Sequence, residues 1–105
     1  MLSLCQPIEV KMVAAALRRS PVAAKTWTQL YDALNLDDLT KREYEMLVEM
    51  GYITYEDLFL RIMVQWVSIE GANATWKSLV GAIKQTGDRK TNGYVMEAAR
   101  SLAIC

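Results

Sequence analysis

The residue types that most often carry out chemistry in enzymes are scarce in this chain of 105 residues. It contains no histidine, so the commonest general base is missing and no zinc-binding pattern of cysteine and histidine can be written. Its two cysteines, Cys5 and Cys105, stand near opposite ends without neighbours that would activate a thiol. The carboxylates are spread over polar helical faces, and no glycine-rich phosphate-binding loop is present. The sequence therefore predicts that the protein is not an enzyme and holds no metal or cofactor.

Length and composition predict one folded domain that covers residues 1–105. The hydrophobic content is 52% and the net charge is zero, which is not the composition of a disordered chain. The two isolated cysteines predict reduced thiols in the cytoplasm, although a bridge is open to them if the ends of the chain meet. Glu9 and Lys11 interrupt the apolar N-terminus, which excludes a signal peptide. No apolar run approaches the ~20 residues that span a bilayer, so we expect no membrane insertion.

Helical periodicity covers almost the whole chain, and no segment shows the alternation of a strand. We therefore expect an all-α protein, a six-helix antiparallel bundle. Pro21 should end the first helix, Thr26 should cap the second, and Gly51 should end the third. Thr54 should cap the fourth, with Asp57 completing a capping box. The expected helices are residues 8–19, 27–34, 38–50, 54–69, 75–85 and 92–103.

Each expected helix carries an apolar stripe that should face a common core. The fourth helix is apolar on two sides, so it must lie at the centre of the bundle or cover its second side with a partner. The residues expected in the core are Trp27, Leu30, Leu34, Leu58, Ile62, Trp66, Leu79 and Ile83.

Two segments resemble the death-domain family. Residues 27–36, Trp-Thr-Gln-Leu-Tyr-Asp-Ala-Leu-Asn-Leu, are similar to the family's second helix, Trp-x-x-Leu-Ala-x-x-Leu-Gly-Leu. Tyr31 departs from this pattern, and Asn35 stands where the family usually has glycine. Residues 62–83, with an apolar helix through Trp66, a break and a new helix, are most similar to death domains of the Fas-associated adaptor type. The resemblance covers nearly the whole chain and implies a Greek-key arrangement of the six helices.

Membership of this family would imply a protein–protein interaction module. Death domains assemble apoptotic or innate-immune signalling complexes in the cytoplasm, so the implied role is that of an adaptor without catalytic activity. The implied partners are other death-domain proteins and possibly further copies of this chain, with no nucleic acid among them.

The zero net charge is a cancellation of oppositely charged regions. Residues 26–57 carry eight acids and two bases, a balance of −6, whereas residues 1–25 and 77–105 each carry a balance of +3. Opposite patches suit head-to-tail contacts between copies, although an evenly solvated surface without a partner is the simpler alternative. The expected acidic patch is Asp32, Asp37, Glu43, Glu45 and Glu49, and the expected basic patches are Lys11, Arg18, Arg19, Lys25, Arg61, Arg89 and Lys90.

Death domains assemble through three kinds of asymmetric contact, which the resemblance carries over to these patches. In one, the third-helix glutamates face the basic residues between the first two helices of a neighbour. In another, Lys11 and Arg61 face Asp32 or Asp37. In the last, the fourth helix and the loop after it meet the loop around Arg89.

A small helical nucleic-acid-binding domain, similar to a helix-turn-helix, is the alternative function. Lys77, Lys84, Arg89 and Lys90 would then contact phosphates. The acidic middle of the chain and the lack of a strongly basic recognition helix count against this alternative.

Overall fold

Six α-helices make up the computed structural model, which describes residues 7–101. The helices are α1 (Val10–Arg18), α2 (Pro21–Ala33), α3 (Asp38–Glu49), α4 (Tyr55–Glu70), α5 (Trp76–Gln85) and α6 (Arg89–Ser101). A short 3₁₀ helix, Gly71–Asn73, links α4 to α5. Within residues 7–101 there is no β-strand, only an isolated bridge between Pro7 and Thr75. The predicted all-α bundle of six helices is therefore confirmed.

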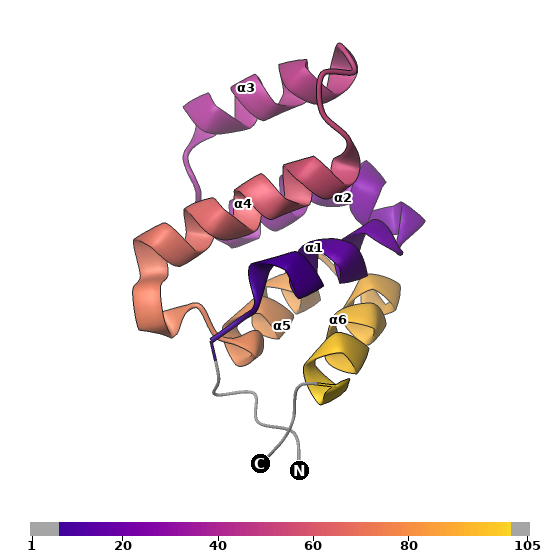
Figure 1. Cartoon of the computed structure of the whole chain (residues 1–105), viewed down its shortest axis with the longest axis vertical. Helices are drawn as coiled ribbons and strands as arrows, with labels where there is room; N and C mark the ends of the chain where they lie inside the picture. Colours follow the sequence, from indigo (N-terminus) through magenta and orange to yellow (C-terminus); the bar gives the residue numbers. More distant parts are fainter. Residues whose placement is uncertain (1–6, 102–105) are drawn as a thin grey trace.

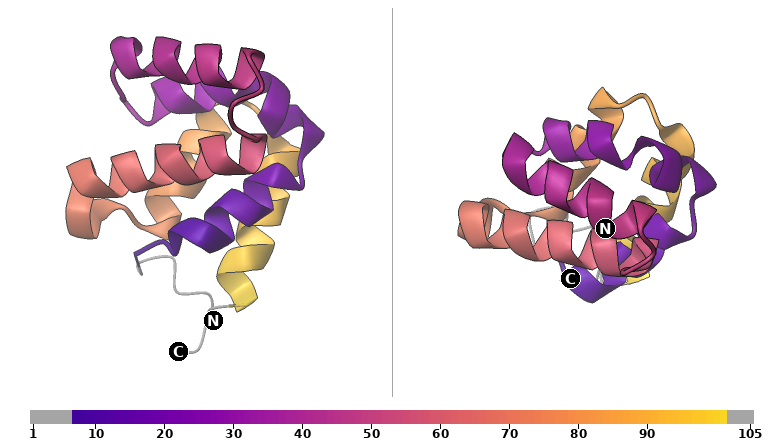
Figure 2. Two further views of the ribbon diagram at one scale, coloured as in Figure 1. Left: turned by 45° about the horizontal axis from the view of Figure 1, so that its top comes forward. Right: turned by 90° about the horizontal axis from the view of Figure 1, so that it is seen from above.

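The helices surround one core, to which α3 contributes only partly buried side chains, among them Tyr44 and Val48. α1 packs against both α4 and α6, while α5 packs against α6 and α2. α3 lies at the edge of the bundle, with α4 as its main neighbour and α5 and α6 on the far side of the molecule (Figures 1 and 2). This arrangement leaves one long side of α3 without a partner among residues 7–101.

The second helix begins six residues earlier than expected. Pro21 occupies its first turn, where the missing N–H of proline costs nothing, and the Ser20 side chain accepts a hydrogen bond from the Ala23 N–H. Thr26 does not cap a new helix, because its hydroxyl donates to the Val22 carbonyl 2.8 Å away. The backbone at Thr26 leaves the helical region (φ −115°, ψ 19°), so α2 is kinked there. The predicted start at residue 27 was therefore wrong, because this residue follows a kink within α2 and does not begin a new helix.

The limits of the first and last helices also differ from the prediction. α1 begins at Val10 because Glu9 caps it, and Ile8 instead donates its N–H to the Ala74 carbonyl. α6 begins at Arg89, three residues early, because the Asp88 carboxylate accepts the Thr91 N–H at 3.0 Å. The expected end of this helix near residue 103 lies outside the described residues.

The caps of the middle helices match the prediction. Thr54 accepts a hydrogen bond from the Asp57 N–H, and the Asp57 side chain accepts one from the Thr54 N–H, which makes the expected capping box. Gly51 follows α3 with a φ of +74°, a left-handed conformation in which glycine is unstrained. Asn35 follows α2 with a φ of +58°, so its backbone adopts the conformation for which the family pattern carries glycine.

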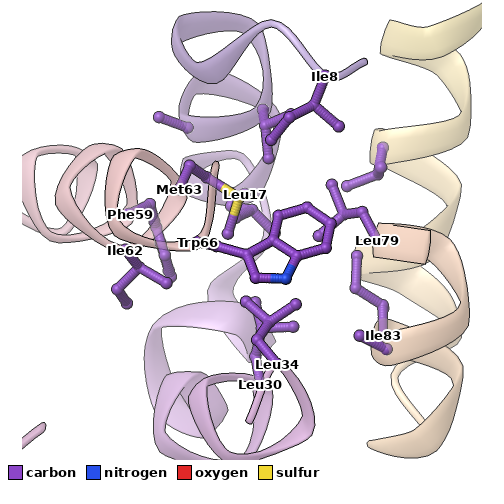
Figure 3. Packing of buried hydrophobic residues seen from close by; sticks show 14 of the residues in the cluster. Ile8, Leu17, Leu30, Leu34, Phe59, Ile62, Met63, Trp66, Leu79 and Ile83 are labelled. Atoms are coloured by element: carbon purple, nitrogen blue, oxygen red, sulfur yellow. The ribbon is translucent and has the colours of Figure 1, made fainter. Parts of the chain in front are cut away.

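All eight side chains expected in the core are buried. The Trp66 indole extends from α4 toward Leu30 and Leu34 of α2 and toward Leu79 and Ile83 of α5, so one ring joins three helices (Figure 3). Dense contacts of this kind around a large ring are a main source of stability in a small domain.

The two-sided apolar character of α4 is explained only in part by its central position. Leu58, Phe59, Ile62 and Met63 are completely buried and lie within one arc of about 140° around the helix. Val64, on the second apolar side, remains 52% exposed, and Ile69, near the C-terminal end, remains 62% exposed. The core therefore covers one broad face of this helix, and the described chain leaves part of its second side exposed.

Candidate protein-binding surface

The outward side of α3 exposes two large apolar side chains, and a third follows at its C-terminal cap. No residue of α3 is buried. Leu39 is 71% exposed, and Met46 and Met50 are each 59% exposed. Acidic side chains and one exposed base, Arg42, lie beside these apolar groups. We refer to this region as the α3 surface, made of Leu39, Glu43, Glu45, Met46, Glu49 and Met50.

Three members of the predicted acidic patch lie on the α3 surface. Glu43, Glu45 and Glu49 are exposed, and in the part of the chain that the structure describes none of them lies within ion-pair distance of a base. Their negative charge is therefore not neutralised by this part of the chain.

The other two members of that patch are engaged within the protein. Asp32 forms an ion pair with Lys41 at 2.9 Å. Asp37 caps α3 by accepting the backbone N–H and the hydroxyl of Thr40, at 2.9 and 2.8 Å. These hydrogen bonds, the backbone one above all, hold the pKa of Asp37 below its ordinary value. The expected acidic patch is thus divided into an outward group and a group that fixes the start of α3.

A polar cluster attaches α3 to the bundle. Gln65 of α4 donates from Nε2 to Asp37 Oδ1 at 3.0 Å and to the Tyr31 hydroxyl at 3.2 Å. The Tyr44 hydroxyl donates to Gln65 Oε1 at 3.1 Å. Removal from water raises the pKa of both tyrosines. We refer to Tyr31, Asp37, Tyr44 and Gln65 as the polar cluster. Its hydrogen bonds add to the packing of the partly buried Tyr44 and Val48 against the core.

Sequence reasoning did not identify this cluster. The sequence analysis gave Gln65 no role in a site, and it noted Tyr31 as a departure from the family pattern without predicting a hydrogen bond. The Tyr31 side chain is fully buried, and its hydroxyl donates a hydrogen bond to Asp37 Oδ1. An apolar side chain at this position could not make this bond. The available signal was a tyrosine on the apolar stripe of the second helix, because a buried polar group needs a partner.

The basic residues at the end of α1 are already paired. Arg18 lies 3.5 Å from Glu56, and Arg19 lies 3.7 Å from Glu97. The Arg19 guanidinium also stacks over the Tyr94 ring, 4.7 Å from its centre. The charges at this corner are therefore more intermixed than the one-dimensional pattern predicted.

The remaining predicted bases are exposed and scattered. Within the described residues none of them is in an ion pair. Arg89 is one of three cations along a groove beside α6, together with Lys84 and Arg100. The nucleic-acid alternative had already grouped Lys84 with Arg89, whereas Arg100 was not predicted. The other bases of the predicted patches that lie outside the groove are Lys11, Lys25, Arg61 and Lys90, all exposed.

Other kinds of site find no support in residues 7–101. That range contains no group of three or more cysteine, histidine, aspartate or glutamate side chains arranged to hold a metal ion. None of its helices has both the length and the apolar character needed to cross a membrane. Cys5 and Cys105, for which reduced thiols were expected, lie outside the described residues.

No model of a known protein family, no curated protein and no solved structure matches this chain. The death-domain resemblance therefore depends on the two sequence segments and on the number and order of the helices.

Proposed function

We propose that this chain is a protein–protein interaction module of the death-domain type, which assembles cytoplasmic signalling complexes by docking onto other death domains and onto further copies of itself. The observation that carries the proposal is the α3 surface. It combines Leu39, Met46 and Met50, each more than half exposed, with three glutamates that have no ion-pair partner in the described chain.

The side chains of this surface are typical of an unoccupied protein–protein interface. Exposed apolar side chains gathered on one face mark sites of association, and methionine adapts its shape to a partner. Charges around such a centre set the orientation, the choice of partner and the rate of encounter. Because each exposed pair contributes less than ~1 kcal/mol, the binding must be the sum of many weak contacts.

Function would then follow from proximity. Copies that dock in sequence bring tethered enzymes together and raise their effective concentration, without a chemical step in the domain itself. Its partners would be chosen by the exposed faces of the helices, since the same fold can carry different surfaces.

Sedimentation velocity of the purified chain, across protein concentration and at low and high salt, tests the proposal. We expect self-association that weakens with salt, as screening predicts. Leu39→Ser with Met46→Ser, and separately Glu45→Lys, should reduce association and leave the circular dichroism melt unchanged. Ile69→Ser, an exposed apolar residue of α4, is the matched control.

Two results would contradict the proposal. One is a wild-type chain that stays monomeric at every concentration in low salt. The other is association of the α3-surface variants at the wild-type level.

A further inference from the structure

A groove beside α6 is lined in part by positively charged side chains. It has a volume of about 640 Å³, and its lining includes Lys84, Arg89, Asn92, Gly93, Met96 and Arg100. We refer to it as the α6 groove. The opposite side of α6 carries Thr91, Val95 and Ala99, which are buried in the bundle. The groove therefore lies along the outward-facing side of α6, where a partner can bind.

The spacing of the groove residues along α6 is regular. Arg89, Gly93, Met96 and Arg100 are separated by steps of four, three and four residues, which place them on one face of an α-helix. At 1.5 Å per residue, Arg89 and Arg100 stand ~16 Å apart along the axis. Lys84 comes from the last turn of α5, a few residues before Arg89 in the chain. The groove thus has two cations toward its Arg89 end and one at its Arg100 end.

These cations are not neutralised by the described chain. None of the three is in an ion pair within residues 7–101. The acidic residue in the lining is Asp88, and both of its carboxylate oxygens accept hydrogen bonds from Thr91. At the middle of the groove, a Cβ added to Gly93 would meet no atom within 4 Å, so a partner backbone can approach closely. The groove is accordingly suited to an elongated anionic partner.

α3 carries acidic side chains with a similar spacing. Asp38 and Glu49 are also eleven residues apart, hence ~16 Å along the helix and on nearly the same line. Glu45 stands one turn before Glu49, and the exposed Met46 lies between the two ends. The same side also carries one exposed base, Arg42, between Asp38 and Glu45. α3 therefore has two acids without an ion-pair partner in the described chain toward its C-terminal end. At its N-terminal end, the Asp38 side chain is 83% exposed and forms an ion pair with Lys41 at 3.5 Å.

We propose that the α6 groove of one copy receives α3 of a second copy of this chain in an antiparallel orientation. Glu45 and Glu49 then face the end with Lys84 and Arg89, while Asp38 faces Arg100. Met46 lies over Met96 and the space left by Gly93. The antiparallel direction also sets the positive N-terminal end of one helix beside the negative C-terminal end of the other. This inference rests on the proposed function, and it names the surface that receives α3.

Two features of the fold favour the α6 groove over the corner between α1 and α2. Arg18 and Arg19, at that corner, are already paired with acids of their own chain, so docking there would require those pairs to separate. In addition, α3 and α6 lie on opposite sides of the molecule (Figure 1). A copy whose groove is filled still offers its own α3, so the contact is heterologous and builds a string or a ring.

Charge reversal and charge swapping test the inference by sedimentation velocity in low salt. Lys84→Glu with Arg89→Glu alters one end of the groove, and Glu45→Lys with Glu49→Lys alters the end of α3 that faces it. Each pair should raise the self-association Kd by about tenfold or more. A chain that carries all four substitutions exchanges the charges at this end of both surfaces, and it should regain most of the wild-type association. Lys11→Glu with Lys25→Glu, two exposed bases outside the groove, should have a smaller effect.

A second variant tests the groove without altering charge. Gly93→Leu places a side chain in open space, so it should keep the fold and block docking. Gly81→Leu, at a helical glycine of α5 that is equally uncrowded, is the matched control. Circular dichroism melts verify that each variant is folded.

The outcomes separate this inference from the proposed function. Wild-type association that the groove variants leave unchanged overturns the α6 groove and leaves the interaction module standing. A monomeric wild-type chain overturns both. Groove variants that lose binding to a short DNA duplex at the same salt, and yet self-associate normally, would overturn the inference and favour a nucleic-acid site.

Discussion

Ser20 and Thr91 are 71 residues apart in the sequence, yet their hydroxyl oxygens hydrogen bond at 2.7 Å in a fully buried position. The Ser20 hydroxyl also caps α2, and the Thr91 hydroxyl donates to the Asp88 carboxylate at the start of α6. Two helix N-termini are thereby joined through their capping groups. The contact fixes where α6 begins relative to α2, and thus the direction of the α6 groove.

Replacement of Thr91 by valine should destabilise the fold. The shape is kept, but Ser20 and Asp88 each lose a hydrogen-bond partner in or near the interior, a loss that typically costs about 1–3 kcal/mol. Urea denaturation measures the free energy of unfolding. Thr28→Val, a half-buried threonine of α2 for which the structure shows no hydrogen bond of the side chain, is the control and should change it by less than ~0.5 kcal/mol. Equal effects of the two substitutions would contradict this role of Thr91.

Truncation of Trp66 should cost far more stability than truncation of an exposed residue on the same helix. Trp66 is 4% exposed and joins three helices, so Trp66→Ala should reduce the free energy of unfolding by about 3–5 kcal/mol. Ile69→Ala removes an apolar side chain that is 62% exposed, and we expect a change of less than ~0.5 kcal/mol. A thermal midpoint that Trp66→Ala leaves unchanged would remove this residue from the core.

Loss of the polar cluster should loosen α3 selectively. Gln65→Leu removes the hydrogen bonds to Asp37 and Tyr31 and the acceptor for Tyr44, while α1 and α4 keep their apolar contacts. We therefore expect faster amide hydrogen exchange in α3 than in α1 or α4, measured by mass spectrometry. Ser68→Ala, which removes only a bond to a carbonyl of its own helix, is the control. Uniform acceleration across all helices would show that α3 is not a separate unit.

Acidic pH should weaken the start of α3 through Asp37. Its pKa in the folded chain lies below that of an unfolded aspartate because Thr40 donates two hydrogen bonds to the carboxylate. Its contribution to stability is therefore complete above about pH 3.9, the ordinary aspartate value, and is lost as the pH falls through the lower folded value. Asp37→Asn keeps a capping side chain without the charge, so this part of the pH dependence should disappear. Denaturation curves between neutral and strongly acidic pH test it, and identical slopes for the two chains would contradict it.

Asn35 should tolerate glycine and reject a β-branched residue. Its φ of +58° lies in the left-handed region, which glycine adopts freely and asparagine tolerates. Asn35→Gly should leave the thermal midpoint nearly unchanged, whereas Asn35→Val should destabilise by roughly 1–2 kcal/mol. Similar melts for the two variants would mean that the turn adopts another conformation in solution.

Some helix limits were predictable because their signals are local, and others were not. The capping box of Thr54 and Asp57 was correctly predicted, since its hydrogen bonds join residues three apart. The early starts of α2 and α6 were missed, although Ser20 and Asp88 are ordinary capping residues. Pro21 was interpreted only as the end of the first helix, and it serves equally well as the first residue of the next.

Composition and periodicity alone determined that this chain is an all-α bundle with Trp27, Trp66 and Ile83 inside, because the burial of an apolar stripe depends on spacing within one helix. Only the tertiary structure decided what the surface offers. It paired Arg18 and Arg19 with acids from distant helices, engaged Asp32 and Asp37 in holding α3, and brought Lys84 beside Arg89 and Arg100. The net charge of a surface region depends on which side chains folding brings together. It cannot be calculated from their positions along the chain alone.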